Sequence, residues 1–188
     1  MNKQIHIMLV EDHAGYRETI AIALEQSDNM QLGSQFGTAE IALRALQNTA
    51  SPKQPDVILL DLNLPGMSGL EALPWIKGYA PNSEVIILTQ SDNAADVTRA
   101  ISEGAAGYLL KSATFKEITE GIETVMEGGA TLDPEVARFI INTLRSQPKP
   151  TPPEKTLSER EMEVLELIGQ GLAKKEIASE LKISVTTV

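Results

Sequence analysis

The sequence predicts an α/β fold, in which a doubly wound parallel sheet of five strands is followed by a small all-helical unit. Three observations lead to this prediction. Short apolar runs alternate with amphipathic stretches of helical period throughout residues 1–129. A proline-rich stretch interrupts the chain at 147–153, and further helical stretches follow it. The length of 188 residues suits one ordinary domain with a smaller one beside it.

Strands are expected where apolar runs are short and flanked by polar or turn residues, at 5–10, 30–36, 57–60, 85–88 and 108–110. The runs 57–60 and 85–88 are apolar throughout, which is typical of parallel strands covered on both faces. Helices are expected between and after them, at 14–27, 38–47, 68–79, 92–103 and 114–127. Trp75 is expected to pack the helix at 68–79, rather than to bind a cofactor.

The pattern changes after the fifth helix. Asp133 and Pro134 form a favourable N-cap and first-turn pair, which predicts a helix that ends near Arg145. Residues 147–153 hold four of the ten prolines, so they predict a stiff, extended linker.

Helix–turn–helix spacing follows the linker. Ser158 and Glu161 have the spacing of a capping box, and helices are expected at 158–168 and 174–181, with a new one starting at Ser184. A five-residue helix is not stable alone, so we expect that a piece of this unit is missing. The expected domains are 1–129, a linker region at 130–156 and the partial helical domain at 157–188.

Composition excludes several classes of protein. The chain has no cysteine, which excludes disulfide scaffolds, thiol nucleophiles and cysteine-ligated metals. No apolar run approaches the length of a membrane span, so we expect a cytoplasmic protein with no membrane partner. The net charge of −10 argues against bulk nucleic-acid binding, although most of the excess acid lies before residue 146.

Polar side chains end several of the expected strands. Glu11 and Asp12 follow the first strand, Asp61 follows the third, Thr89 follows the fourth and Lys111 follows the fifth. In a doubly wound sheet ordered 2-1-3-4-5, the first and third strands are neighbours, and ligands bind at their carboxyl ends. Converging carboxylates need a cation, and oxygen ligands of this kind suit Mg²⁺. A hydroxyl and an ammonium beside them would meet the charged oxygens of a phosphoryl group.

Each of these residues also has a simpler explanation when it is taken alone. A carboxylate at a strand end is usually a solvated loop residue, Thr89 could cap a helix, and Lys111 could be a surface charge. Tyr108 could be core packing with its hydroxyl at the surface. Their joint placement at successive strand ends is what favours a site.

The front part of the chain resembles the receiver domain of two-component response regulators, from Ile5 to about Gly128. The resemblance rests on ordered motifs: VED at 10–12, LDLNLPGMSG at 60–69, LT at 88–89 and GYLLK at 107–111. It implies a flavodoxin-like sheet of order 2-1-3-4-5.

The resemblance also implies roles for the acidic residues. Asp61 would accept a phosphoryl group from a sensor histidine kinase. Glu11, Asp12, Asp61 and the carbonyl of Asn63 would hold Mg²⁺.

The same resemblance implies a switch. Lys111 would pair with the phosphate, Thr89 would move to hydrogen-bond it, and Tyr108 would swing as the aromatic switch. Two positions depart from the family pattern: Gln90 stands where a small residue is common, and Ser112 stands where a cis proline is frequent.

The end of the chain resembles the start of a LuxR-type DNA-binding domain, in the motifs LSEREMEVL at 157–165, GLAKKEIA at 171–178 and LKISVTTV at 181–188. Together with the receiver, this is similar to the NarL/FixJ subfamily. The implied DNA-binding residues are Lys174, Lys175, Ser184, Thr186 and Thr187. The main base-reading positions would follow Val188, so binding of double-stranded DNA needs a recognition helix that this sequence lacks.

The expected function is therefore phosphorylation-controlled transcription regulation, without enzyme activity, by a protein that forms a homodimer when phosphorylated. One alternative is a Mg²⁺-dependent phosphohydrolase with an aspartyl-phosphate intermediate; Asn63 disfavours it, because an amide cannot transfer a proton. Flavin binding is a second alternative, disfavoured because Glu11 and Asp12 would repel a phosphate. A helical hairpin used for dimerisation is the alternative for the last domain.

Overall fold

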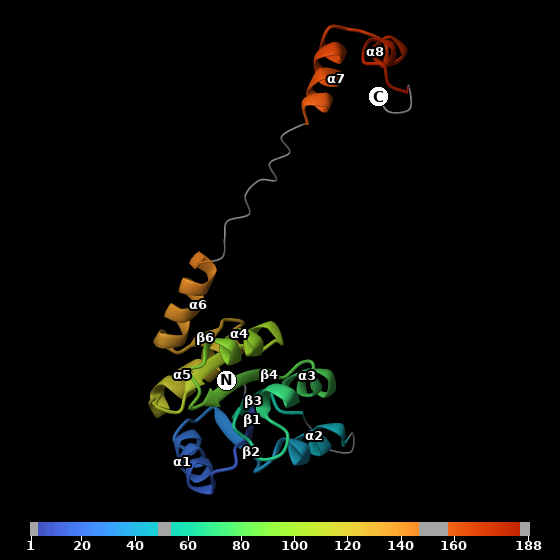
Figure 1. Ribbon diagram of the computed structural model, residues 1–188. Helices are drawn as coiled ribbons and strands as arrows, with labels where there is room; N and C mark the ends of the chain where they lie inside the picture. Colours follow the sequence, from blue (N-terminus) through green and yellow to red (C-terminus); the bar gives the residue numbers. More distant parts are fainter. Residues whose placement is uncertain (1–3, 49–53, 147–157, 185–188) are drawn as a thin grey trace. The chain divides into compact units, whose positions relative to one another are not determined.

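The sheet of the computed structural model has six strands in the order β2-β1-β3-β4-β5-β6, and all neighbouring pairs are parallel (Figure 1). The structure describes residues 4–48, 54–146 and 158–184. The strands are β1 (Ile5–Val10), β2 (Met30–Phe36), β3 (Val57–Leu60), β4 (Glu84–Thr89), β5 (Gly107–Leu110) and β6 (Thr131–Leu132). The predicted order of the first five strands is confirmed. The prediction of five strands was wrong by one, since β6 is too short to show a period.

Six helices accompany the sheet: α1 (Ala14–Glu25), α2 (Ala39–Gln47), α3 (Gly69–Tyr79), α4 (Ala94–Ser102), α5 (Phe115–Met126) and α6 (Pro134–Ser146). Most of them begin at a side chain that accepts a backbone N–H. Ser68 and Thr114 form capping boxes with Glu71 and Glu117. His13, which the sequence did not reveal as a cap, does so through Nδ1 at the start of α1.

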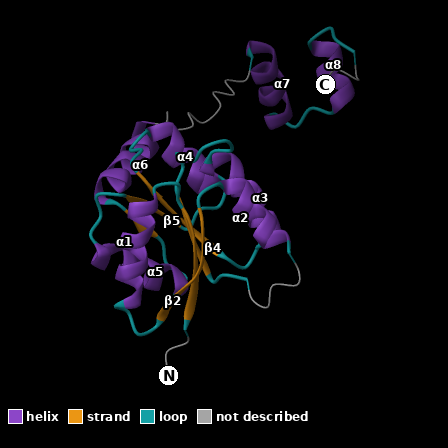
Figure 2. Ribbon diagram, turned by 90° about the horizontal axis from the view of Figure 1, so that it is seen from below, coloured by secondary structure: helices purple, strands orange, loops and turns teal. Residues whose placement is uncertain are grey.

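Helices cover both faces of the sheet (Figure 2). On one face, α1 and α5 pack on a cluster that includes Ile20 and Ile118; on the other, α2, α3 and α4 pack on a cluster that includes Leu73 and Val97. Strand β3 is fully buried between them, and each such side chain contributes about 1.5–3 kcal/mol to stability. Trp75 does not join this core: it is 55% exposed and packs along α3 by stacking on Tyr79.

Helix α6 lies against α4 and extends the same compact unit, Met1–Ser146. Its predicted start is confirmed, because Asp133 Oδ1 accepts the N–H of Glu135. The Asp133 N–H in turn donates to the Tyr108 carbonyl at 2.9 Å, and Val136 is buried in the core. The proline-rich stretch predicted at 147–153 lies outside the described residues.

The second unit, Gln147–Val188, contains α7 (Glu159–Gly169) and α8 (Lys174–Glu180). Both helices were predicted at these places. Ser158 caps α7 in a capping box with Glu161, and Ile177 and Ala178 are the buried residues of α8. Within the described residues, no helix is long and apolar enough to span a membrane.

Candidate functional site

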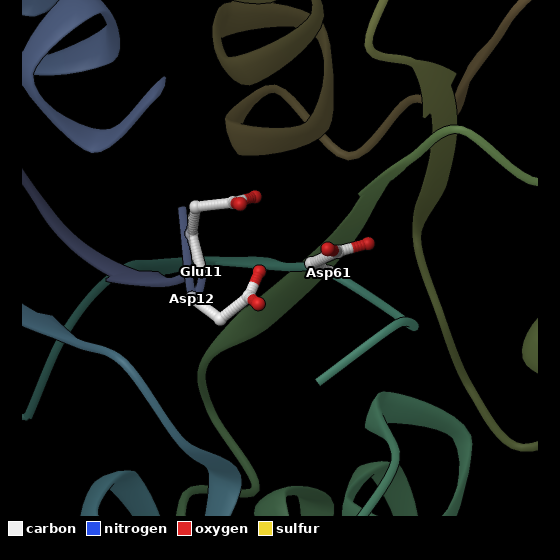
Figure 3. A group of neighbouring side chains, drawn as sticks. All are labelled: Glu11, Asp12 and Asp61. Atoms are coloured by element: carbon white, nitrogen blue, oxygen red, sulfur yellow. The ribbon is translucent and has the colours of Figure 1, made fainter. Parts of the chain in front are cut away.

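Three carboxylates gather where β1 and β3 end side by side. Glu11 and Asp12 follow β1, and Asp61 follows its neighbour β3, as Figure 3 shows. Ligand oxygens of the three side chains lie within 4.8 Å of one another. Glu11 and Asp61 are buried and Asp12 is exposed. The sequence predicted this cluster, and parallel pairing produces it, because parallel strands end at the same edge of the sheet.

Lys111 supplies the positive charge that these buried acids require. Its ammonium lies 2.6 Å from Glu11 Oε2 and 2.8 Å from Asp61 Oδ2. Burial raises the pKa of the Glu11 carboxyl, and the hydrogen bond from Lys111 works against that rise. Burial lowers the pKa of the Lys111 ammonium, but hydrogen bonds to Asp61 and Glu11 outweigh it and raise the pKa above its usual value. The lysine therefore stays charged beside Asp61.

The loop after β1 is held by residues that sequence analysis missed. Arg17 Nη1 donates to the carbonyls of Glu11 and Asp12, at 2.6 and 2.8 Å. The His13 N–H donates to Glu11 Oε1 at 3.0 Å. The arginine holds the backbone of both acidic residues, and the His13 N–H orients the Glu11 carboxylate. The sequence does show an arginine, Arg17, one turn into α1. Its spacing does not show that its side chain turns back to bind this loop.

A close backbone contact positions the loop after β3. The Asn63 N–H donates to Asp61 Oδ1 at 3.2 Å, which orients the carboxylate. Gly69 begins α3 directly against this residue: a Cβ built there would lie 2.1 Å from the Asp61 carbonyl oxygen. Glu40 of α2 holds the same loop, since its Oε1 accepts the Met67 N–H at 2.9 Å. Only glycine fits at position 69.

Thr89 and Tyr108 lie on the β4 and β5 side of the site, where the sequence placed them. Both are fully buried. Thr89 Oγ1 accepts the Ser91 N–H at 3.4 Å and the Asn63 side-chain amide at 3.5 Å. The Tyr108 hydroxyl donates to the Ser91 carbonyl at 2.7 Å. Tyr108 therefore packs in the core. The simpler explanation placed its hydroxyl at the surface, but the hydroxyl is buried and bonded to Ser91.

An open pocket of about 510 Å³ lies over these groups. Asp12, Asp61, Asn63 and Lys111 line it. Gln90 also lines it, so the departure from a small residue puts an amide at the entrance. The described residues contain no cis peptide bond, so the bond before Ser112 is trans.

The donor set fits a hard divalent cation. Three carboxylates offer oxygen ligands within reach of one ion, and Mg²⁺ prefers oxygen ligands from one or two carboxylates together with water and phosphate. Glu11 and Asp61 carry a charge that a single lysine does not balance. Asp12 and Asp61 both face the open pocket, where an ion has access.

Models of two protein families match the chain. The model described as "Response regulator receiver domain" matches residues 7–123, and "Bacterial regulatory proteins, luxR family" matches residues 155–188. The first match alone covers more than half of the chain. The chain belongs to the two-component response regulators of the NarL/FixJ subfamily. A response regulator of this subfamily acts on DNA, and the matches lend no support to the phosphohydrolase alternative.

Relatives of this response regulator match it over 76–98% of its length. The oxygen regulatory protein NreC of Staphylococcus carnosus is 35% identical, over 97% of this chain and 85% of that one. The response regulator ChrA of a heme-sensing two-component system has 30% identity and a TM-score of 0.59, over 98% of this chain and 84% of that one. A LuxR-family response regulator of Aurantimonas has 29% identity and a TM-score of 0.69, over 76% and 99%.

The residues expected to contact DNA are only partly described. Lys174 and Lys175 are exposed in the first turn of α8, and Ser184 is exposed after it. Thr186 and Thr187 lie outside the described residues, as does the helix expected to begin after Ser184. Ala173 at the start of α8 provides no side-chain cap, as its side chain predicts.

Proposed function

We propose that Asp61 of this response regulator accepts a phosphoryl group from a sensor histidine kinase. The observation that carries the proposal is the ammonium of Lys111 placed 2.8 Å from Asp61 Oδ2, inside a cluster of three carboxylates. A solvated loop carboxylate would not be buried beside a lysine and two other carboxylates. A carboxylate that must receive a charged phosphoryl group needs both cation and open access.

The transfer follows from the geometry around Asp61. A carboxylate oxygen attacks the phosphorus of the donor, the new O–P bond forms, and the bond from phosphorus to the leaving group breaks. The leaving group departs with the electron pair, as the imidazole of the donor histidine or as acetate from acetyl phosphate. Lys111 is placed to pair with one phosphoryl oxygen, and Thr89 lies one strand away as a second hydrogen-bond donor.

Mg²⁺ is the cofactor that the donor set suits. Glu11, Asp12 and Asp61 would hold it, with the carbonyl of Asn63 as a further ligand. When bound, Mg²⁺ neutralises charge that develops on the phosphoryl oxygens. The chain's own contribution is orientation: Arg17 and the His13 N–H fix the loop that carries the first two acids.

The output of the switch is DNA binding by the helical domain, as a homodimer in the cytoplasm. Lys174 and Lys175 are exposed and would lie near DNA phosphates, with Ser184, Thr186 and Thr187 at the recognition helix. The protein has no catalytic role in this proposal beyond accepting its own phosphoryl group. Asn63 supports that distinction, because its amide donates to Thr89 and cannot act as an acid or base.

Phosphate-affinity electrophoresis tests the proposal. The wild type and Asp61→Asn are incubated with acetyl phosphate and Mg²⁺, and each is then sized by light scattering. We expect a retarded band and a dimer for the wild type only. A retarded Asp61→Asn band would place the acceptor elsewhere. Steady release of phosphate from a phosphate ester would instead support the phosphohydrolase.

A further inference from the structure

An aromatic ring that sequence analysis left without a function lies beside the lysine of this site. Tyr16 is in the first turn of α1 and also lines the pocket over Asp61. The Lys111 ammonium lies over its ring, 5.1 Å from the ring centroid. This is within the range of a cation–π interaction, which is stronger where water is excluded. The Lys111 side chain is only 12% exposed.

The hydroxyl of Tyr16 does not explain why the residue lies at this site. It is buried, and among the described residues it has no hydrogen-bond partner. Burial, with a further effect of the Glu11 carboxylate, raises the pKa of Tyr16 to about 12, so the ring stays neutral at physiological pH. The contact that Tyr16 makes with the site is therefore the face of its ring against the ammonium.

Lys111 needs such a contact because its side chain is long and flexible. Its ammonium has three N–H donors, and it pairs with the carboxylates of Glu11 and Asp61. Hydrogen bonds to carboxylates tolerate several lysine rotamers, whereas a ring wall limits the side of the pocket from which the ammonium approaches. The Tyr16 N–H is itself fixed by His13 Nδ1 at 3.1 Å, so the ring has a firm base.

We propose that Tyr16 is a positioning residue for phosphoryl transfer, whose ring holds the Lys111 ammonium in place against Asp61. The inference rests on the proposed function, because it names a further group that serves the same acceptor. It predicts that the ring, and not the hydroxyl, matters. Phenylalanine at position 16 should therefore preserve phosphoryl transfer, and an aliphatic residue should impair it.

The experiment compares the full chain with Tyr16→Phe, Tyr16→Leu and Tyr16→Met, using acetyl phosphate with Mg²⁺ as the probe. Tyr16→Leu and Tyr16→Met should raise the KM for acetyl phosphate about three- to tenfold, because the ammonium is less confined. The KM of Tyr16→Phe should stay within about twofold of the wild-type KM. Two aliphatic variants are used so that one remains if the other does not fold.

A second readout reports the ring contact itself. In proton NMR, the ε-methylene signals of Lys111 should be shifted upfield by the ring in the wild type and in Tyr16→Phe. They should return to ordinary positions in both aliphatic variants. If Tyr16 served packing alone, the aliphatic variants would have a lower melting temperature, but their KM and their Lys111 signals would not change together.

The outcomes separate this inference from the proposed function. If the wild type is labelled and a folded aliphatic variant keeps its KM, the positioning role of Tyr16 is wrong while Asp61 remains the acceptor. If Tyr16→Phe has the same defect as Tyr16→Leu, the ring face does not carry the effect and the inference is also wrong. If the wild type takes up no phosphate, both proposals fail.

Discussion

Tyr108 connects the edge of the acidic site to the helix that follows the sheet. Its hydroxyl donates to the Ser91 carbonyl at 2.7 Å, in the loop after Thr89, and its own backbone carbonyl accepts the Asp133 N–H at 2.9 Å. Asp133 caps α6, and α6 packs against α4. A shift of the loop after β4 therefore has a direct physical route to α6. This relationship makes Tyr108 the part of the proposed switch best suited to mutation.

Tyr108→Phe removes the hydroxyl and leaves the part-buried Ser91 carbonyl without this donor. We expect a loss of about 1 kcal/mol in the free energy of unfolding, measured by urea denaturation. Labelling by acetyl phosphate should persist, because the hydroxyl that is removed bonds to Ser91 and not to the acceptor, whereas phosphorylation should change the size of the protein less. Tyr16→Phe is the matched control, since the hydroxyl it removes has no partner among the described residues. Equal stability of Tyr108→Phe and wild type would contradict the role of this bond.

Gly69→Ala tests whether the acceptor depends on the close approach of α3. The added Cβ would lie 2.1 Å from the Asp61 carbonyl oxygen, so the backbone of the acceptor must move. We expect a destabilisation of about 3 kcal/mol and slower labelling of Asp61. Gly78→Ala, in the same helix, is the control: nothing lies within 4 Å of its Cβ, and it should gain about 0.5–1 kcal/mol. Thermal unfolding of both variants gives the comparison, and equal effects would show that contact with Asp61 is not the cause.

The sequence predicted the elements of the receiver and the main site residues because each depends on local pattern. Strand β3 is apolar throughout because it is covered on both faces, and Asp61 is the first polar residue after it. What pattern does not show is which residues of other elements turn toward the site. Arg17 and Glu40 fall on helix surfaces in sequence, yet both bind loop backbone. Nor does pattern show that Trp75 lies exposed on α3, since an apolar residue on a helix need not face the core.

The pKa of Glu40 predicts how acid affects the loop between Asp61 and α3. Hydrogen bonding to the Met67 N–H lowers the pKa of the Glu40 carboxyl below its usual 4.5. A lowered folded pKa adds stability that is present above the unfolded value and is lost as pH falls through the folded value. Glu40→Gln should therefore be less stable than wild type at pH 7, and the difference should shrink on acidification below about pH 4.5.

Denaturation as a function of pH measures this difference, and hydrogen exchange of the Met67 amide locates it. Glu18→Gln, which changes an exposed glutamate of α1, controls for the loss of one charge. Faster exchange at Met67 is expected for Glu40→Gln alone. A stability difference that stays constant from pH 7 to pH 3 would mean that the Glu40 charge does not hold the loop.

Asp12→Asn separates metal binding from folding. Asp12 is the exposed member of the carboxylate cluster, so its substitution should change the stability of the metal-free protein by no more than about 0.5 kcal/mol. Wild type should gain stability with added Mg²⁺, by about 2.7 kcal/mol at a concentration 100 times the Kd. Asp12→Asn should lose most of this gain, as measured by thermal unfolding with and without chelator. Asp28→Asn, an exposed aspartate before β2 at the opposite edge of the sheet, should keep it. A full Mg²⁺ response in Asp12→Asn would exclude this side chain as a ligand.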